Sequence, residues 1–378
     1  LYLADLRSGL VRPVAAPGLV GWNRWSPGGR WYSFGVGATV DADLWLLDAE
    51  ALRLMRLSRG AAADHRWLRP GLLLHYVTAE DGLGLVGVDL AGGRRLGLAL
   101  PGQEFRGMLS RDQSVVTVGR SRQVYLRPAA PAAPLSAPLP LGPTAPKMVR
   151  VSPEGVFVNT VAVAEGGRRL VYAFTRSRGI PGGANTLYVD SLGIYTADGQ
   201  AAEMALGFRA DLRDGDLTLS PDGRYLMIDY VNSTDEPAQG LYLYDLDERR
   251  LIWQRPKRGM SPHLIGWEAG GPVVMDCSGD RSGCTGWRVT PSGRLEGWVP
   301  SVSLYHLAGE GWAWRTVDAW WFKSPGRPAR RLPLSDLPPG ADTAEPPFFD
   351  RRSGLVKLSP AGSPVEYLLP TRPDRWQP

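Results

Sequence analysis

The sequence predicts an all-β fold made of small antiparallel sheets that stack on one another. A tight turn recurs along the 378 residues, and the clear copies lie between apolar runs of strand length. The chain also contains 46 glycines and 33 prolines without a collagen-like period, which indicates many short strands separated by turns. A sheet of this size cannot bury its own apolar faces, so it must stack on copies of itself.

Two copies of the turn define the repeat. The clearer one has the sequence Ser-Pro-Asp-Gly-Arg at residues 220–224, between strand-like segments at 216–219 and 225–230, and the second lies at 26–30. Pro and Asp favour a turn, Gly supplies a positive φ, and Arg remains at the solvent-exposed edge. We therefore predict that this turn joins the first two strands of each sheet.

The repeat length fits one blade of a β-propeller, in which four short strands and their turns occupy about 40–50 residues. Each turn is followed by a second hairpin, such as residues 241–245 and 251–253, so each unit contains four strands. We mark each copy of the turn by its last turn residue, and successive markers lie 40 to 56 residues apart. The markers are Gly29, Gly71, Gln113, Gly167, Gly223, Gly271, Gly311 and Gly354.

The two ends of the chain are predicted to share one blade. Residues 1–6 and 10–14 form an isolated hairpin, and segments 348–349, 355–358 and 365–369 supply the remaining strands. Such a closure removes the free sheet edges that promote aggregation. We expect a single domain over residues 1–378 with eight blades, and seven blades as the alternative because the last copy of the turn is the poorest.

Two segments depart from the pattern. Residues 49–57 are good helix formers, but they lie where the repeat places a second hairpin, and we predict strands there. Residues 129–146 are rich in Pro and Ala, and we expect a loose connection between the third and fourth units.

The sequence Ser-Pro-Asp-Gly-Arg-Tyr-Leu at residues 220–226 resembles the repeat of TolB-type, WD-like bacterial β-propellers. Residues 26–31 resemble it again, with Gly28 in place of the Asp. The resemblance extends over most of the chain as a pattern and implies a propeller fold. The shared motif carries no catalytic residues. The family also spans periplasmic adaptors, peptidase gating domains and uncharacterised surface proteins, so the resemblance implies no particular activity.

The charge pattern does not favour a nucleic-acid partner. The net charge is +5 at pH 7, and the basic residues lie near turns instead of in one block. No stretch of the sequence is long and apolar enough to span a membrane. The chain begins with a strand-like segment at Leu1, so we expect that a preceding export signal or membrane-anchor helix was removed.

The two cysteines, Cys277 and Cys284, bracket a turn rich in Ser and Gly. We expect a disulfide, which would stabilise the fold by about 2–3 kcal/mol. A disulfide indicates an oxidising compartment, and we therefore expect an extracytoplasmic protein, whether periplasmic, at the cell surface or secreted. The alternative is a pair of incidental thiols in a cytosolic protein.

Motifs for catalysis or cofactor binding are missing from the sequence, which has no Gly-x-Ser-x-Gly elbow, phosphate-binding loop or His-Glu-x-x-His helix. Residues 211–216 hold three carboxylates without the spacing of an EF-hand loop, so we favour a polar turn over a calcium site. His65, His263 and His306 fall on first strands, at different heights relative to the turn, and we favour packing over a shared metal. We predict no metal and no cofactor.

Loop length provides the best functional indication. The connection between the second and third strands is long in the fourth, fifth and sixth units, and function tends to reside on loops held by a rigid scaffold. We predict that these loops bind a protein or peptide through Arg176, Arg178, Asn185, Asn232, Asp235, Glu236, Asp280 and Arg281. The structural alternative is that these loops are long without having a function, because longer surface loops cost little stability.

A non-enzymatic binding propeller is the function that we favour. One alternative is a hydrolase or lyase with its active site at the mouth of the central channel, which requires a cluster of His, Asp or Glu around the axis. The other is a purely structural domain.

Overall fold

The computed structural model describes residues 2–370 except 6–9, 14–17, 19, 27–28, 38–41, 60–64, 80–81, 120–121, 129–130, 135–147, 177–187, 231–238, 258–259, 269, 279–283, 302, 308–310, 317, 324–329, 337–347, 351–354 and 359–366. The chain divides into two compact units, which are described separately. The first comprises Leu1–Asp5 and Leu10–Gly215, and the second comprises Leu6–Gly9 and Asp216–Pro378.

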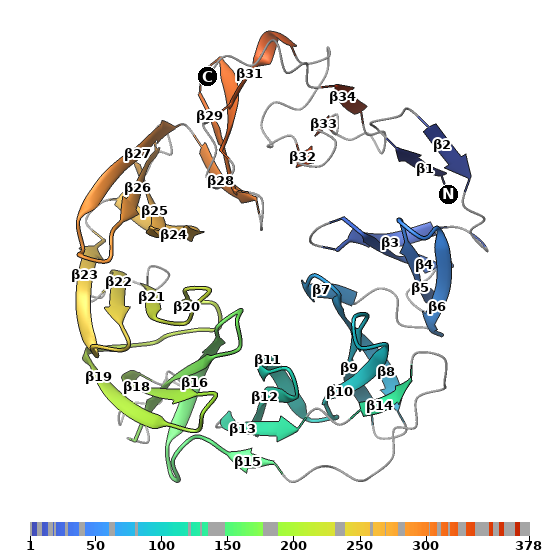
Figure 1. The fold of residues 1–378 in the computed structure, drawn as a ribbon. Coiled ribbons are helices and arrows are strands. Elements are labelled where there is room, and N and C mark those ends of the chain that lie inside the picture. Colours follow the sequence, from blue (N-terminus) through green and yellow to red (C-terminus); the bar gives the residue numbers. More distant parts are fainter. Residues whose placement is uncertain are drawn as a thin grey trace. The chain divides into compact units, whose positions relative to one another are not determined.

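Besides a two-stranded sheet described below, the described part of the first unit contains four larger antiparallel sheets built mainly from consecutive strands (Figure 1). Sheet I consists of β3 (Val20–Trp25), β4 (Trp31–Val36), β5 (Asp43–Asp48) and β6 (Arg53–Ser58). Sheet II consists of β7 (His65–Arg69), β8 (Leu72–Ala79), β9 (Gly82–Asp89), β10 (Arg94–Ala99) and β14 (Pro131–Pro134). Sheet III consists of β11 (Gln103–Ser110), β12 (Gln113–Val118), β13 (Gln123–Pro128) and β15 (Val149–Arg150). Sheet IV consists of β16 (Phe157–Val163), β17 (Arg169–Thr175), β18 (Val189–Thr196) and β19 (Ala201–Ala210).

The second unit continues the pattern with three four-stranded sheets. Sheet V consists of β20 (Leu217–Leu219), β21 (Tyr225–Tyr230), β22 (Gly240–Asp245) and β23 (Arg250–Pro256). Sheet VI consists of β24 (Met260–Glu268), β25 (Gly271–Ser278), β26 (Cys284–Val289) and β27 (Leu295–Ser301). Sheet VII consists of β28 (Ser303–Leu307), β29 (Gly311–Arg315), β30 (Ala319–Lys323) and β31 (Arg330–Pro333), and a 3-10 turn, η1 (Leu334–Asp336), follows it.

Shorter sheets occur toward the two chain ends. Strands β1 (Tyr2–Asp5) and β2 (Leu10–Pro13) pair with each other, and β32 (Phe348–Asp350), β33 (Leu355–Leu358) and β34 (Tyr367–Pro370) form a three-stranded sheet. The predicted strands at both ends are therefore confirmed. The blade shared between them, the number of blades and the single domain stay predictions.

The recurring four-stranded antiparallel sheet is the building block of β-propellers, and the all-β prediction is confirmed. Residues 53–58 form β6, as the repeat predicted against helix propensity. Part of the expected loose connection is instead a strand, because β14 pairs with β10 as the fifth strand of sheet II. Pro131 and Pro134 are tolerated there because β14 lies at the edge of the sheet. Among the described residues, no helix has the length and apolar character required to cross a bilayer.

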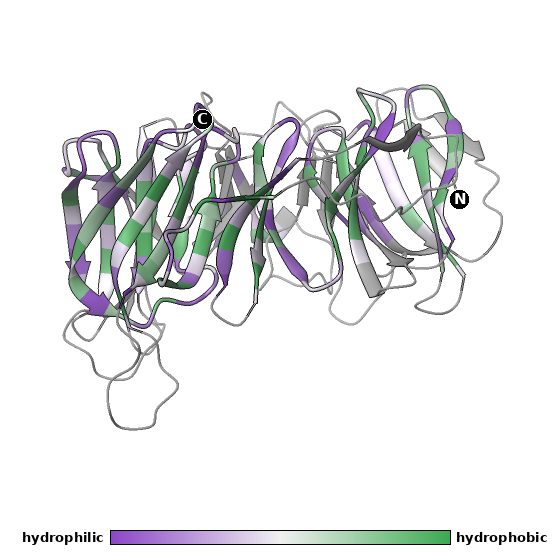
Figure 2. Cartoon of the chain, turned by 90° about the horizontal axis from the view of Figure 1, so that it is seen from below, coloured by the Kyte–Doolittle hydropathy of each residue, from purple (hydrophilic) through white to green (hydrophobic). Residues whose placement is uncertain are grey.

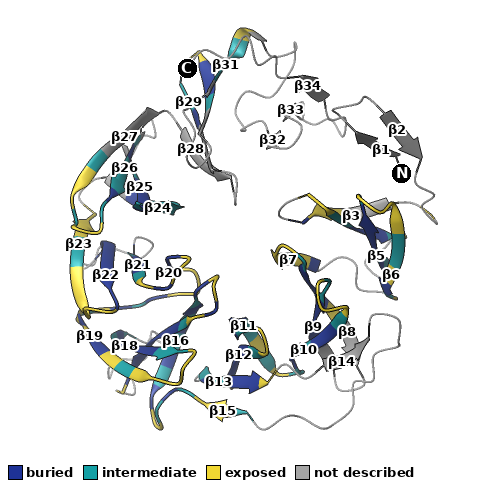
Figure 3. Ribbon diagram, viewed as in Figure 1, coloured by how far each residue is buried: buried dark blue, intermediate teal, exposed yellow. Residues whose placement is uncertain are grey.

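Apolar side chains pack between neighbouring sheets within each unit. Leu44 and Leu46 of sheet I form one cluster with Leu73 and Val88 of sheet II. Figure 2 shows hydrophobic stretches within the strands and hydrophilic residues in many connecting turns. Strand β22 is buried at every position, whereas the fourth strand of its sheet, β23, is mainly exposed (Figure 3). Burial of apolar area at about 25 cal/mol per Å² stabilises this stacking.

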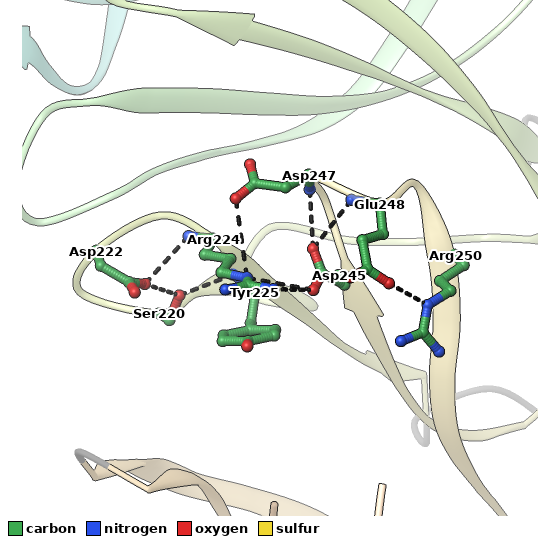
Figure 4. Close-up of polar contacts among 8 residues, drawn as sticks. All are labelled: Ser220, Asp222, Arg224, Tyr225, Asp245, Asp247, Glu248 and Arg250. Atoms are coloured by element: carbon green, nitrogen blue, oxygen red, sulfur yellow. Dashed lines mark hydrogen bonds and ion pairs between the residues drawn. The ribbon is translucent and has the colours of Figure 1, made fainter. Parts of the chain in front are cut away.

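The tight turn makes the same hydrogen bonds in sheets I and V. Ser220 Oγ accepts the N–H of Tyr225 at 2.9 Å (Figure 4). Ser220 O accepts the N–H of Gly223 at 2.8 Å. Ser26 Oγ accepts the N–H of Trp31 at 3.0 Å in the equivalent place. Gly223 has a φ of 76°, which only glycine adopts at little cost. The predicted turn is confirmed.

Candidate functional site

Arg176 is the one predicted partner-binding residue that lies within the described part of the chain. The other seven lie outside it: Arg178, Asn185, Asn232, Asp235, Glu236, Asp280 and Arg281. Their loops follow β17, β21 and β25, the second strands of sheets IV, V and VI. In an antiparallel sheet of four consecutive strands, the second and fourth strands end where the first and third begin. We call this side of each sheet the loop edge.

Arg176 forms an exposed ion pair at the loop edge of sheet IV. Its Nη2 donates to both carboxylate oxygens of Glu203 at 2.7 Å, and its guanidinium carbon lies 5.1 Å from the centroid of the Phe174 ring. The two charged side chains are 59% and 43% exposed. Exposed pairs contribute only about 0–1 kcal/mol to stability, so these charges are available to a partner at little cost to the fold.

An ionic network joins sheet III to the connection that follows sheet IV. Arg106 Nη1 donates to Asp214 Oδ2 at 2.9 Å, Arg106 Nε donates to Thr117 Oγ1 at 3.2 Å, and Arg106 Nη2 donates to Glu104. Arg122 Nη1 donates to Asp214 Oδ1 at 2.9 Å. The Arg106 side chain is only 13% exposed. The carboxylates of Asp214 and Glu104 compensate the positive charge of this guanidinium, which is largely withdrawn from water.

The same connection is fixed to sheet IV through Asn159. Its side-chain Nδ2 donates to Asp211 Oδ1 at 3.5 Å and also to Leu212 O. The backbone carbonyl of Asn159 accepts Arg122 Nη1 at 2.7 Å. Both oxygens of Asp214 are already paired with arginines. These contacts support the polar-turn interpretation of residues 211–216.

A second polar group lies between sheets V and VI, at the loop edge. Asp229 of β21 accepts the N–H of Leu264 through Oδ2 at 3.2 Å, and Asp276 of β25 accepts Arg255 Nη2 through Oδ2 at 2.5 Å. Pro262 lies directly opposite Asp276 in the β24–β25 ladder, two residues before Leu264. Asp229 therefore contacts β24 and Asp276 contacts Arg255 of β23, and the two lie one residue and two residues before the ends of β21 and β25.

Each of these two carboxylates keeps one buried oxygen unused. Oδ1 of Asp229 and Oδ1 of Asp276 have no hydrogen-bond partner in the described part of the chain. The Asp276 side chain is 8% exposed, and a buried polar atom without a partner costs about 1–3 kcal/mol. His263 Nδ1 lies 3.9 Å from Asp229 Oδ2. The pair can therefore accept further hydrogen bonds from a donor at the base of the fifth and sixth loops.

The histidines lie on the strands that were predicted. His65, His263 and His306 belong to β7, β24 and β28, the first strands of sheets II, VI and VII. His65 lies opposite His75 in the β7–β8 ladder, and both are buried. Over the described residues, no group of three or more His, Cys, Asp or Glu side chains is arranged to hold a metal ion.

Cys277 and Cys284 lie directly opposite each other in the β25–β26 ladder. Cα atoms of opposed residues in an antiparallel pair are about 4.5–5.5 Å apart, within the range of about 4.4–6.8 Å that a disulfide spans. The register is compatible with the disulfide, which stays a prediction.

Sequence reasoning missed the residues that make up the described base of the loop edge. Arg106 and Asp214 are 108 residues apart in the chain, and no local pattern connects them. Glu203 lies on β19, 27 residues from Arg176, and no local pattern connects the two. The acid-rich segment at residues 211–216 could be recognised in the sequence, but its arginine partners could not.

No protein-family model matches the sequence, and no curated protein matches it. The chain is similar to the β-propeller domain of Myceliophteria thermophila Cps50 (Swd1), with 15% identity, coverage of 85% of this chain and 96% of that domain, and a TM-score of 0.38. It is also similar to TolB from Acinetobacter baumannii, with 15% identity, coverage of 68% and 59%, and a TM-score of 0.31. For the tricorn protease the identity is 10% and the TM-score 0.45, with coverage of 88% of this chain and 36% of the protease. The fold assignment therefore rests on the chain's own four-stranded sheets, and the resemblance to TolB-type repeats extends to structure only as a distant similarity.

Proposed function

We propose that the chain is a non-enzymatic propeller module that acts outside the cytoplasm and binds a protein or peptide through the loop edge. The observation that carries the proposal is the pair of buried, unused oxygens on Asp229 and Asp276, which lie at the roots of two elongated loops. A polypeptide partner offers donors, such as a lysine ammonium or a backbone N–H, that can satisfy such oxygens.

The charges of the loop edge support a polypeptide over a nucleic acid. Arg176 and Glu203 present opposite charges at sheet IV. Asp229 of sheet V and Asp276 of sheet VI are acidic. Binding to a phosphate backbone requires a surface that is predominantly basic. Side chains of both signs are typical of protein–protein contacts, where complementary charges set specificity.

Loop replacement tests this proposal. Residues 177–185 are replaced by a short Gly-Ser linker in the full chain, and the matched control changes Asp198 and Gln200, in the turn at the opposite edge of sheet IV, to Ser. Crosslinking in cells identifies the bound polypeptide, and its Kd is then measured with the purified partner. We expect the linker variant to melt like the wild type and to bind at least about tenfold more weakly, a loss of about 1.4 kcal/mol, while the control binds normally.

A loop variant that folds and binds with an unchanged Kd would remove the loop of sheet IV from the binding surface. Asp276→Asn then tests the loop edge of sheet VI separately, because it keeps the size of the side chain and removes its charge. If neither change affects binding, the proposed surface is wrong. Fractionation of the full-length gene product tests the location, and recovery in the cytoplasm alone would contradict it.

A further inference from the structure

Strand β19 of sheet IV is interrupted by a large bulge close to the loop edge. Asp190 of β18 alone lies opposite the four residues 206–209 of β19, because its two neighbours in β18 pair with Ala205 and Ala210. A continuous ladder would place one residue opposite Asp190, so β19 carries three extra residues there. Bulges redirect side chains and are frequent beside functional sites.

The bulge is anchored at both ends and exposed between them. Leu206 and Ala210 are buried, whereas Gly207 and Arg209 are exposed. Gly207 has a φ of 79°, which glycine adopts at little cost, and a Cβ atom at this position would meet no atom within 4 Å. The bulge is therefore an open projection on a fixed base, and a contact made through it would cost little conformational entropy.

Arg209 carries the charge of the bulge, and this charge is not neutralised within the described part of the chain. Other arginines at the loop edge of sheets III and IV pair with carboxylates, as Arg176 does with Glu203 and Arg122 with Asp214. The exposed side chain of Arg209 forms no ion pair or hydrogen bond with the residues that the structure describes. Its five N–H donors are therefore available to a group outside the chain.

The bulge lies near the start of the sheet IV loop. Donation to Glu203, with a smaller contribution from the charge of Asp190, raises the pKa of Arg176. Asp190, which lies opposite the bulge, is therefore close to Arg176. Arg176 directly follows the end of β17, where the loop predicted to bind a partner begins.

We propose that residues 207–209 contact the polypeptide that binds the loop edge, and that Arg209 pairs with an acidic side chain of this partner. The inference rests on the proposed function and adds the chemistry of one contact to it. A carboxylate accepts two parallel N–H groups of a guanidinium, which fixes the position of the bound group as well as its charge.

The first test removes the bulge. Deletion of residues 207–209 takes out the three extra residues and lets β18 and β19 pair without interruption, so we expect the full chain to melt at or above the wild-type temperature. The probe is the polypeptide captured by the crosslinking described above, in purified form. We expect the deletion to raise its Kd at least about tenfold.

The second test reverses the charge of the contact. Arg209→Glu should also raise the Kd at least about tenfold, because it places a carboxylate opposite the acidic side chain of the partner. Arg168→Glu is the matched control: Arg168 is likewise an exposed arginine of sheet IV, in the turn at the opposite edge, and its replacement should leave the Kd unchanged. A partner variant in which the acidic residue becomes Arg should restore binding to Arg209→Glu.

The outcomes separate this inference from the proposed function. An unchanged Kd in both bulge variants, with weaker binding after replacement of residues 177–185, would overturn the inference and leave the proposed function standing. Weaker binding in the deletion alone would overturn the pairing of Arg209. If crosslinking captures no polypeptide, both proposals fail. If the deletion does not fold, Arg209→Glu still decides, because it changes an exposed side chain that holds no other residue in place.

Discussion

Arg224 fixes the end of the third strand of its own sheet by binding Asp245. Its Nε and Nη2 donate to Asp245 Oδ2 at 3.2 and 2.8 Å, while Asp245 Oδ1 accepts the backbone N–H groups of Asp247 and Glu248 (Figure 4). The arginine of the first turn thus holds the second turn of the same sheet.

The same relationship recurs in sheet I. Arg30 Nη2 donates to Asp48 Oδ2 at 3.0 Å, and Asp48 Oδ1 accepts the N–H groups of Glu50 and Ala51. In sheet II the equivalent acid, Asp89, accepts the N–H of Gly92. The arginine and the aspartate of the repeat therefore have one structural role, which is to hold two turns together.

Removal of this aspartate is predicted to destabilise sheet V. Asp245→Ala deletes the acceptor of three hydrogen-bonding groups at a position that is 2% exposed, and we expect a loss of about 2–3 kcal/mol in the free energy of unfolding. The control is Asp247→Ala, because that side chain is half exposed and its backbone N–H remains; it should change stability by less than about 0.5 kcal/mol. Urea denaturation of both variants measures the difference, and equal stabilities would contradict the role of Asp245.

How much of the fold could be predicted from the sequence depends on how far apart in the chain the interacting residues lie. The turn at residues 220–224 and its copy at 26–30 were predictable, because each is specified by five consecutive residues. The fifth strand of sheet II was not, since Pro131 and Pro134 disfavour strands and only the free edge of β10 makes β14 possible.

The burial of charged residues could not be predicted from the sequence either. Arginine is normally an exposed residue, so Arg95 and Arg127 carried no signal that they are buried. The contact of Arg106 with Asp214 depends on the packing of sheets III and IV, which the local sequence does not specify.

His75 is predicted to make the fold sensitive to mild acid. Burial, with a smaller contribution from the charge of Arg95, lowers the pKa of His75 from 6.5 to about 4. The unfolded chain therefore binds a proton more readily than the folded chain between these values, so stability is fully present above pH 6.5 and is lost as the pH falls toward 4. The difference corresponds to about 3 kcal/mol over that interval. Urea denaturation at several pH values measures it.

One variant isolates this effect. His75→Leu should flatten the stability profile between pH 4 and 6.5. Asp245 does not interfere: burial raises its pKa, but donation from Arg224 and two backbone N–H groups holds the pKa below its ordinary value. Its stabilising contribution is therefore lost only at lower pH. A profile in His75→Leu that matches the wild type would contradict the assignment.

Gly193 is predicted to be irreplaceable for steric reasons. A Cβ atom at this position would overlap the ring of Tyr172, which is 4% exposed on the neighbouring strand. We expect Gly193→Ala to cost about 2–3 kcal/mol. Gly207→Ala is the comparison, because no atom lies near its Cβ position and only its positive φ of 79° opposes alanine, at a cost of about 1 kcal/mol. Adding Tyr172→Leu should reduce the loss in Gly193→Ala, and strictly additive losses in the double variant would show that the two residues do not conflict.

The last prediction concerns the ladder between β25 and β26. Because Cys277 and Cys284 occupy opposed positions, we expect them to be joined by a disulfide in the protein purified from its own compartment. Alkylation before and after reduction, followed by mass spectrometry, should label the pair only after reduction. Replacement of both by Ser should lower the free energy of unfolding by about 2–3 kcal/mol, and the same loss should appear in the wild type when it is reduced. Free thiols in the native protein would remove the support that this pair gives to an oxidising compartment, while the fold and the binding proposals would stand on their own observations.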